Sequence, residues 1–530
     1  DQRPAAWRYY PSSRQFIVAK HILPCSRFHH LPNRRHGGAV RRSSGAFGLI
    51  PDTQAHYRPH MDILPPLRSA IGNANVLTGK DTAKWQSDWM GVYALDPIAV
   101  LRPANTAEVS AIMEIAHASG TPVVPVSGNT GLVGGTQAKG ALMLSLDRMN
   151  AIREVRPASR IAIVEAGVIL SALHDAAASH DLIFPLTFGA RGSAMIGGVL
   201  STNAGGSNVV RYGNTRDLCL GLEVVLADGR VMDLMSELHK DNSGYNLRHL
   251  MIGAEGTLGI ITAAVMKLHP KPRAYATAMV AVPSIADALA LLNTMQDASG
   301  GAVEAFEYMP RNYIQGHIDQ IAGAREPFDA PYDVNILIEV AATAPRDATP
   351  ATDGRIPVIA LLEDTLGAML ENGTLLDAVI AQNDNQRQQM WARREAAAEI
   401  THGVTPFVDT DIALPLDKIA TFFDLITPRL TALDPDATQL TVAHLGDGNI
   451  HFSMYPTSTD PALHDAMMEA VEDVVQTLRG SFSAEHGIGT SKLSSMARRK
   501  DPVALDVMRA VKAALDPKGI LNPGKTLPKP

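Results

Sequence analysis

Residues 125–135 read PVSGNTGLVGG and contain four glycines in eleven positions. The apolar pair Val123-Val124 precedes this stretch, and an apolar run from Leu142 to Leu146 follows it. The pattern predicts two strands joined by a glycine-rich loop. Because each glycine costs conformational entropy, such a loop is expected where the backbone needs positive φ or approaches a ligand closely. Successive backbone N–H groups can cradle an anion, such as the pyrophosphate of a dinucleotide.

Taken alone, this loop has a plain alternative interpretation, a tight connection between two strands. Its glycines do not follow the Rossmann G-x-G-x-x-G spacing, and no Walker lysine follows them. Two further glycine clusters occur downstream, GGVLSTNAGGSNVVRYGNTRD at residues 197–217 and IGAEGTLGIIT at residues 252–262. Three clusters in one part of the chain favour a cofactor site.

The segments around these clusters alternate between helix-like and strand-like patterns. Apolar periodicity predicts helices over residues 107–118 and 171–182 and a strand over residues 161–168. Residues 220–234 are typical of a hairpin with Asp228-Gly229 at its turn. A chain of 530 residues is too long for one core, so two or three domains are expected.

After residue 270 glycine becomes sparser. Strand-like runs at residues 274–284, 302–309 and 334–341 alternate with helical segments, which predicts a second domain of α+β character. Residues 377–399 are predicted to form one polar helix.

The bulk composition narrows the class of protein. Hydrophobic residues make up 46% of the chain and charged residues 19%, which is typical of a globular protein. No window approaches eighteen uninterrupted apolar residues, so no transmembrane segment is predicted. The two cysteines, Cys25 and Cys219, cannot build a disulfide framework, and a reducing compartment fits them.

Residues 1–60 differ from the rest, with ten Lys or Arg, two acids and six histidines. Such a leader fits a mitochondrial transit peptide, and it equally fits a disordered extension or translation from a misplaced start. Its formal charge is +8, so the formal net charge of −7 for the whole chain leaves about −15 for the body. We expect no nucleic-acid binding, because that needs clustered Lys and Arg.

Two late motifs gather groups that can bind a metal. AHLGDGNIHFS at residues 443–453 contains His444 and His451, and SAEHGIGTSK at residues 483–492 contains Glu485 and His486. A bend at the Gly-Asp-Gly turn would allow both histidines of the first motif to point into one space. Two histidines and a carboxylate suit a catalytic zinc, while solvent-exposed or hydrogen-bonded histidines are the alternative.

The glycine clusters, together with LGLEVVLADG and KDNSGYNLRHLMIGAEGTLGIIT, resemble the FAD-binding domain of the vanillyl-alcohol oxidase / p-cresol methylhydroxylase superfamily over residues 97–270. The resemblance implies an α+β fold, with a two-part FAD-binding domain of the p-cresol methylhydroxylase type and an α+β cap. The expected parts are the extension (1–60), the FAD-binding domain (61–270), the cap or substrate domain with the metal site (271–490), and a C-terminal segment that returns to the FAD domain (491–530).

The resemblance also implies which residues hold FAD, mostly through their backbone. FAD is expected to be non-covalent, because SGNTGLVGG has no histidine. The expected cofactor-binding residues are Pro125, Ser127, Gly128, Asn129, Thr130, Gly131, Gly134, Gly135, Gly197, Gly198, Ser201, Thr202, Asn203, Gly205, Gly206, Gly256, Gly259, Ile260, Ile261 and Asn522.

The two late motifs and the C-terminal LDPKGILNPGK resemble one branch of this superfamily, the flavin-dependent D-2-hydroxyacid dehydrogenases. That branch oxidises D-lactate, D-2-hydroxyglutarate or glycolate. The resemblance implies that His444, His451 and Glu485 bind a divalent metal, with zinc as the first candidate, and that His486 is the catalytic base. Arg394 would bind the substrate carboxylate, although an arginine pair at this place also fits a solvated helix face. The implied reaction is metal-assisted hydride transfer from the D-2-hydroxy acid to flavin N5.

Three positions depart from the D-2-hydroxyglutarate enzymes of that branch. Ala398, Asp409 and Ser453 stand where those enzymes have threonine, lysine and asparagine for the distal carboxylate. An aspartate there would repel a second carboxylate. We therefore expect D-lactate or a close homologue, with D-2-hydroxyglutarate dehydrogenase or a glycolate oxidase subunit as the alternative.

Other classes remain open at this point. A non-catalytic, FAD-binding electron-transfer subunit would not need the histidine cluster, and an oxygen-using oxidase is a closer rival. The expected electron acceptor is an electron-transfer flavoprotein, a quinone or a cytochrome, and a homodimer is one possible assembly. The expected location is the bacterial cytoplasm, or mitochondria if the basic leader is a genuine transit peptide.

Overall fold

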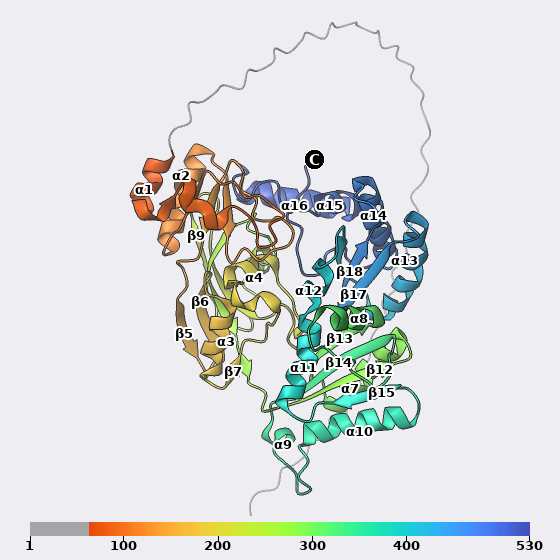
Figure 1. Cartoon of the computed structure of the whole chain (residues 1–530). Coiled ribbons are helices and arrows are strands. Elements are labelled where there is room, and N and C mark those ends of the chain that lie inside the picture. Colours follow the sequence, from red (N-terminus) through yellow and green to blue (C-terminus); the bar gives the residue numbers. More distant parts are fainter. Residues whose placement is uncertain (1–62, 530) are drawn as a thin grey trace, which may run out of the picture. The chain divides into compact units, whose positions relative to one another are not determined.

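The computed structural model describes residues 63–529, so the predicted extension (1–60) lies outside the described residues. Figure 1 shows the helices and strands in chain order. In the described part of the chain, every helix is too short or too polar to cross a bilayer.

The first glycine cluster follows a strand of a four-stranded sheet with the order β1-β2-β4-β3. Strands β2 and β3 both run parallel to β4. The helix predicted over residues 107–118 is present as α2; the Asn105 side chain caps its start and left-handed Gly120 ends it. The elements are α1 (Leu64–Ile71), β1 (Val76–Leu77), β2 (Ala99–Leu101), α2 (Thr106–Ser119), β3 (Val123–Val126) and β4 (Leu142–Ser145).

The other two glycine clusters border a five-stranded antiparallel sheet with the order β5-β6-β10-β8-β9. The predicted hairpin is present, with Val225 opposite Val231 across the turn. The third cluster leads directly into β10 at Ile260. The elements of this part are β5 (Ile152–Arg156), β6 (Ile161–Glu165), α3 (Leu170–Ala178), β7 (Leu182–Ile183), α4 (Ile196–Thr202), α5 (Val209–Tyr212), β8 (Cys219–Val225), β9 (Val231–Leu234), α6 (Leu247–Met251), β10 (Ile260–Lys267) and β11 (His269–Pro270).

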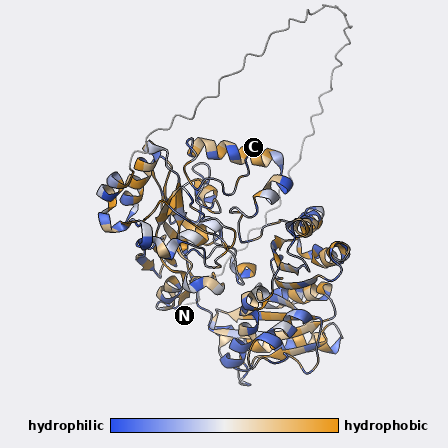
Figure 2. Cartoon of the chain, turned by 45° about the horizontal axis from the view of Figure 1, so that its top comes forward, coloured by the Kyte–Doolittle hydropathy of each residue, from blue (hydrophilic) through white to orange (hydrophobic). Residues whose placement is uncertain are grey.

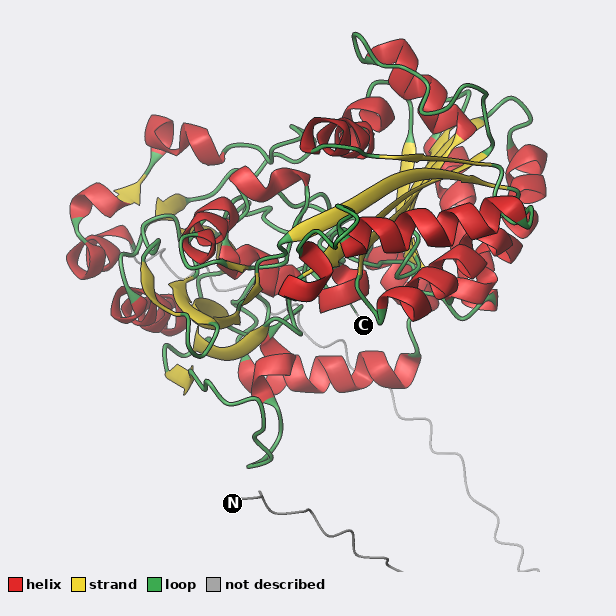
Figure 3. Ribbon diagram, turned by 90° about the horizontal axis from the view of Figure 1, so that it is seen from below, coloured by secondary structure: helices red, strands yellow, loops and turns green. Residues whose placement is uncertain are grey.

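The chain after residue 270 builds a seven-stranded antiparallel sheet with the order β15-β12-β14-β13-β17-β18-β16. Helices lie against its strands (Figure 3). The strands carry much of the hydrophobic colour in Figure 2, whereas the helices show both colours. The strands are β12 (Ala274–Val282), β13 (Val303–Pro310), β14 (Val334–Ala342), β15 (Asp377–Ile380), β16 (Val408–Ala413), β17 (Thr438–His444) and β18 (Asn449–Tyr455). The helices are α7 (Ile285–Ser299), α8 (Arg311–Gln320), α9 (Pro345–Ala348), α10 (Pro357–Glu371), α11 (Asp384–Glu395), α12 (Ala397–His402), α13 (Ile419–Leu433) and α14 (Pro461–Thr477).

The two faces of this seven-stranded sheet have different surroundings. Ile450 and Phe452 of β18 point into an apolar core with Leu291 of α7, Phe422 of α13 and Val471 of α14. Because side chains alternate along a strand, the neighbouring odd-numbered residues of β18 point to the opposite face. That opposite face carries the candidate site.

The prediction of one helix over residues 377–399 is wrong at its start. Residues 377–380 form the edge strand β15, in which Ile380 pairs with Ala278 of β12. The helix α11 begins only at Asp384, where the Asn383 side chain accepts a hydrogen bond from the backbone N–H of Gln386. Pairing with a distant strand decided the conformation of this short segment, and the periodicity of its own residues does not reveal such a partner.

The C-terminal segment, with α15 (Leu493–Arg499) and α16 (Pro502–Leu515), returns to the sheet that carries the first glycine cluster. The backbone N–H of Asn522 donates to the Val123 carbonyl oxygen at 2.8 Å. The Lys512 ammonium group donates to the carbonyl oxygens of Thr257 and Leu521, both at 2.7 Å. The tail is thereby joined to β3 and to the third glycine cluster.

Candidate active site

One cleft of about 440 Å³ brings the glycine clusters and the histidine motifs together. One side, which we name the glycine wall, consists of the cleft-lining parts of residues 125–136, 187–207 and 255–261. The other side, the sheet wall, is formed by Arg394, Asp409, Val442, His444, His451, Ser453, Glu485 and His486.

Most of the residues expected to hold FAD line this cleft. They are Pro125, Ser127, Gly128, Asn129, Thr130, Gly131, Gly135, Gly198, Ser201, Thr202, Gly205, Gly256, Gly259, Ile260, Ile261 and Asn522. Two of the glycines are required by close packing. A Cβ atom on Gly128 would lie 2.1 Å from the Ser193 carbonyl oxygen, and one on Gly256, at φ +71°, would lie 2.4 Å from Pro125 Cγ.

Four of the expected residues do not line the cleft, and each packs against protein instead. A Cβ atom on Gly134, Gly197 or Gly206 would collide with Thr490, Ala166 or Thr187, respectively. The Asn203 side chain accepts a hydrogen bond from the backbone N–H of Arg216. These four residues therefore contact neighbouring segments of the protein and are not part of the cleft surface.

The register of the sheet determines which side chains share its cleft face. Asp411 pairs with His451, and Asp409 pairs with Ser453. His451 is also opposite Val442 on β17, two residues before His444. The strands β17 and β18 join through the Gly-Asp-Gly turn, so both imidazoles point to one side, with ring centroids 5.5 Å apart.

A fully buried glutamate holds the first of these histidines. Glu307 on β13 accepts a hydrogen bond from Arg394 Nε at 2.7 Å and contacts His444 Nδ1 at 2.9 Å. Burial alone would raise the pKa of Glu307, but the charges of His444 and Arg394 outweigh burial and hold this pKa below its usual value. The Nδ1 contact leaves His444 Nε2 directed toward Glu485, 4.0 Å away.

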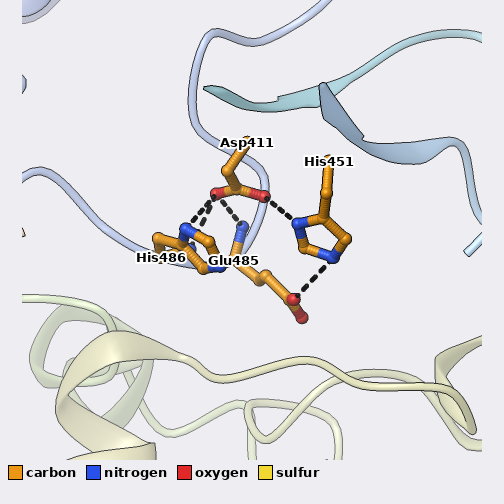
Figure 4. A group of neighbouring side chains, drawn as sticks. All are labelled: Asp411, His451, Glu485 and His486. Atoms are coloured by element: carbon orange, nitrogen blue, oxygen red, sulfur yellow. Dashed lines mark hydrogen bonds and ion pairs between the residues drawn. The ribbon is translucent and has the colours of Figure 1, made fainter. Parts of the chain in front are cut away.

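The second histidine lies in a cluster with Asp411, Glu485 and His486 (Figure 4). His451 Nε2 is 3.4 Å from Glu485 Oε1, the same oxygen that His444 approaches. Burial and the neighbouring His486 lower the pKa of His451 well below its usual value, so its imidazole is neutral. A neutral imidazole is the form that binds a metal.

Asp411 is buried beneath this cluster and accepts hydrogen bonds from three consecutive backbone N–H groups. They belong to Ala484, Glu485 and His486, at 3.1, 3.0 and 2.8 Å from Oδ2. Asn449 donates to its Oδ1 at 2.9 Å. Burial alone would raise the pKa of Asp411, but the charges of His486 and Lys492 outweigh burial and hold this pKa far below its usual value. The carboxylate therefore stays ionised.

The donors at this end of the sheet wall fit a divalent cation. Ligand atoms of Asp411, His451, Glu485 and His486 all lie within 4.8 Å of one another, and His444 approaches the same glutamate. Asp411 already accepts four N–H groups, whereas Glu485 Oε1 lies 4.0 Å from His444 Nε2 and 3.4 Å from His451 Nε2. The Glu307–His444 contact is the carboxylate–histidine arrangement that orients metal-binding imidazoles. The negative charges of Glu307 and Glu485 favour a cation next to His444.

Arg394 is buried, with 8% of its surface exposed, and it lines the cleft. The alternative of a solvated helix face therefore does not apply to it. Further along the same wall, Ser453 donates to Asp409 at 2.7 Å. Within residues 63–529, no lysine or arginine forms an ion pair with Asp409, and Ala398 lines the cleft as well.

Sequence reasoning missed three carboxylates that organise the site, Glu307, Asp411 and Glu255. Asp411 lies between Thr410 and the apolar run Ile412–Leu414, and Glu255 lies within the third glycine cluster; an acidic residue in such surroundings was the available signal. Glu307 lies within the apolar strand run at 302–309, where an inward-facing glutamate needs a partner charge.

Comparison with known protein families and relatives supports this architecture. Residues 97–235 match the family described as FAD binding domain, and residues 271–526 match FAD linked oxidases, C-terminal domain. The chain is 36% identical over 447 residues to "D-2-hydroxyglutarate dehydrogenase, mitochondrial" of Bos taurus, covering 83% of this chain and 79% of that one. It is 34% identical to "D-2-hydroxyglutarate dehydrogenase" of Xanthomonas citri, covering 84% and 92% of the two chains.

The chain belongs to the FAD-dependent D-2-hydroxyacid dehydrogenases. The predicted family, the enzyme class and the FAD cofactor are thereby confirmed. The fold class is confirmed as well, because the dehydrogenase resembles a crystal structure of p-cresol methylhydroxylase with a TM-score of 0.66 over 88% of this chain and 96% of that one, at 16% identity. Alkyldihydroxyacetonephosphate synthase gives the same TM-score of 0.66 at 17% identity, with 88% and 86% covered.

Proposed function

We propose that this dehydrogenase converts a D-2-hydroxy acid into its 2-oxo acid with the help of a divalent cation, and that D-2-hydroxyglutarate is the first candidate substrate. The observation that carries the proposal is the convergence of His444, His451, Glu485 and His486 on a cleft whose other side is the glycine wall. The substrate candidate comes from the relatives, whose printed names specify D-2-hydroxyglutarate. These relatives support D-2-hydroxyglutarate better than D-lactate, which we expected from Ala398, Asp409 and Ser453.

FAD held by the glycine wall would supply the hydride acceptor, and a divalent cation held by His444, His451 and Glu485 would make the substrate hydroxyl more acidic. His486, next to Glu485 in the chain, is the base that takes the hydroxyl proton. The hydrogen on C2 leaves as hydride while the C2–O bond becomes a carbonyl.

Arg394 is the cation for the substrate's C1 carboxylate. Its Nε is held by Glu307 at 2.7 Å, which fixes the plane of the guanidinium group. Within the described residues no hydrogen bond involves Nη1, so this atom is available to an oxygen in the cleft. A guanidinium group held in this way presents a preorganised charge to the carboxylate.

A second candidate is a D-2-hydroxy acid without a distal carboxylate, such as D-lactate. Asp409 and Ser453 favour it, because they lie one pair of residues further along the strands than Asp411 and His451, about 7 Å away by strand geometry. A distal carboxylate that reaches this end of the cleft would meet the Asp409 carboxylate, which forms no ion pair with a lysine or arginine of residues 63–529.

The test is an anaerobic titration of the purified, FAD-loaded protein with D- and L-forms of 2-hydroxyglutarate and lactate. The proposal expects bleaching of the flavin absorbance by D-acids alone, loss of bleaching after chelation, and recovery with added Zn²⁺. The ratio of bleaching rates with D-2-hydroxyglutarate and D-lactate decides between the two candidates. Bleaching that survives complete metal removal would contradict the metal assignment, and no bleaching by any acid would favour a non-catalytic FAD-binding subunit.

The electron acceptor and the assembly stay predictions. We expect an electron-transfer flavoprotein, a quinone or a cytochrome to reoxidise the flavin, and a homodimer is the first assembly to test. Stopped-flow reoxidation with each acceptor class, and light scattering of the FAD-loaded protein, would decide them.

A further inference from the structure

Glu255 is a half-buried residue of the glycine wall whose carboxylate reaches across to the loop that carries His486. Its Oε1 accepts the backbone N–H of Ile488 at 2.8 Å, and its Oε2 accepts that of Gly489 at 2.7 Å. Both oxygens are thus bound to one short segment. Burial raises the pKa of this carboxyl above its usual value despite these two hydrogen bonds.

The backbone of Glu255 is fixed by two other segments of the flavin side. Its N–H donates to the Ser201 carbonyl oxygen at 2.8 Å, and its carbonyl oxygen accepts from the Asn522 side chain at 2.7 Å. Its φ of 51° lies in the left-handed region. This conformation is unfavourable for a non-glycine residue, and it persists where the surroundings hold it. Glu255 is therefore a fixed point from which the carboxylate extends.

The loop after His486 fits closely onto this fixed point. Gly487 and Gly489 both have positive φ, 82° and 50°. A Cβ atom on Gly489 would lie 2.1 Å from the Val133 carbonyl oxygen, and one on Gly487 would lie 3.1 Å from Glu255 Oε1. The backbone N–H of Thr490 donates to the same Val133 oxygen at 2.8 Å. The loop is thereby attached to the first and third glycine clusters.

His486 lies between two carboxylate anchors from opposite walls. On the sheet side, Asp411 accepts the N–H groups of residues 484–486, and on the glycine side, Glu255 accepts those of residues 488 and 489. A substrate in the cleft must lie within about 3–3.5 Å of both the base and the hydride acceptor, and a misplacement of about 1 Å can cost about 100-fold in rate. The spacing of these two groups depends on how the loop with His486 is joined to the glycine wall.

We propose that Glu255 is a positioning residue that sets His486 over the flavin side of the cleft. The inference rests on the proposed role of His486 as the base. Glu255 transfers no proton and binds no substrate; it acts through two hydrogen bonds to the loop. Two of the proposed cation ligands, His444 and His451, lie on β17 and β18, and Asp411 holds the backbone of the third, Glu485.

The test is a double-mutant cycle of Glu255→Gln and His486→Asn in the FAD- and metal-loaded enzyme. Glutamine keeps the size, but its amide group would place an N–H donor against a backbone N–H. We expect Glu255→Gln alone to slow anaerobic flavin reduction by about 30- to 100-fold. In the His486→Asn background, the same change is expected to add less than about a twofold loss, because residues that act as one unit are not additive.

A second readout does not depend on activity. Hydrogen exchange of the segment 486–490 is expected to be faster in Glu255→Gln, while exchange in β17 and β18, FAD content and bound metal stay unchanged. Glu255→Asp, which keeps both oxygens on a shorter side chain, is expected to give a smaller effect in both measurements, and it takes the place of glutamine if that variant does not fold.

Three results would overturn the inference: equal losses of rate in both backgrounds, unchanged exchange of the loop, or release of FAD by Glu255→Gln. The last result would assign the residue to cofactor binding. A His486→Asn enzyme that reduces its flavin at the full rate would instead contradict the proposed function. The two failures are therefore distinguishable.

Discussion

The two walls of the cleft differ in the groups that they present, backbone on one wall and side chains on the other. The glycine wall presents mainly backbone, and its shape comes from glycines that allow close approach, such as Gly128 and Gly256. The sheet wall presents polar and charged side chains, from one face of β16, β17 and β18, from Arg394 of α11 and from the loop with Glu485 and His486. A large cofactor can thus be held by many weak backbone contacts, whereas the proposed reaction would depend on a few side chains that buried carboxylates orient.

Removing the base from the sheet wall is expected to cause the greatest loss of activity. His486→Asn removes the proton acceptor but keeps a polar side chain of similar reach. We expect flavin reduction by the best D-2-hydroxy acid to slow by about 10²- to 10⁴-fold, with FAD content unchanged. Stopped-flow reduction under anaerobic conditions measures this loss. If His486→Asn lost both its FAD and its rate of flavin reduction, cofactor binding and the reaction would not depend on separate walls of the cleft.

The buried charge behind the sheet wall is expected to matter for stability. Glu307→Gln leaves the Arg394 guanidinium group buried without its counter-charge, which typically costs about 3–5 kcal/mol of stability. We expect the free energy of unfolding in urea to fall by this amount. Glu371→Gln, at an exposed position that ends α10, is the matched control and should change stability by less than about 0.5 kcal/mol. Equal effects would contradict the assigned role of Glu307.

On the glycine wall, a matched pair of substitutions tests whether shape or mere glycine content matters. Gly128→Ala would bring a Cβ atom to 2.1 Å from the Ser193 oxygen, whereas no atom lies within 4 Å of a Cβ atom on Gly131. We expect Gly128→Ala to destabilise the apoprotein by about 1–3 kcal/mol through overpacking, and Gly131→Ala to have little effect. Chemical unfolding of both apoproteins provides the measurement, and similar stabilities would rule out the shape argument.

At the far end of the sheet wall, a more modest effect is expected on the choice of substrate. Asp409→Lys replaces a negative charge with a positive one, and Asp409→Asn is the control that removes the charge alone. We expect the lysine variant to raise kcat/KM for D-2-hydroxyglutarate about tenfold relative to D-lactate, equivalent to about 1.4 kcal/mol. The asparagine variant should lie between lysine and wild type. An unchanged ratio would show that the distal carboxylate does not reach Asp409.

Local sequence patterns predict much of the framework correctly. The helix over residues 107–118 and the hairpin over residues 220–234 are present because apolar periodicity and turn residues act over short distances. The segment 377–380 was predicted wrongly because its conformation depends on pairing with β12, about a hundred residues earlier. Glu307 was missed for a similar reason, since its partners Arg394 and His444 come from other elements.

The order of residues along the chain is enough to specify the available chemistry: glycine clusters for a cofactor, and two histidines with an adjacent glutamate–histidine pair near the other end. Which of these groups meet depends on the folded arrangement. The strand register places His451 opposite Asp411 and on the same face as His444, and the loop geometry brings Glu255 onto the segment after His486. Glycine content and periodicity act through neighbouring residues, whereas contacts between distant residues follow from how whole sheets pack.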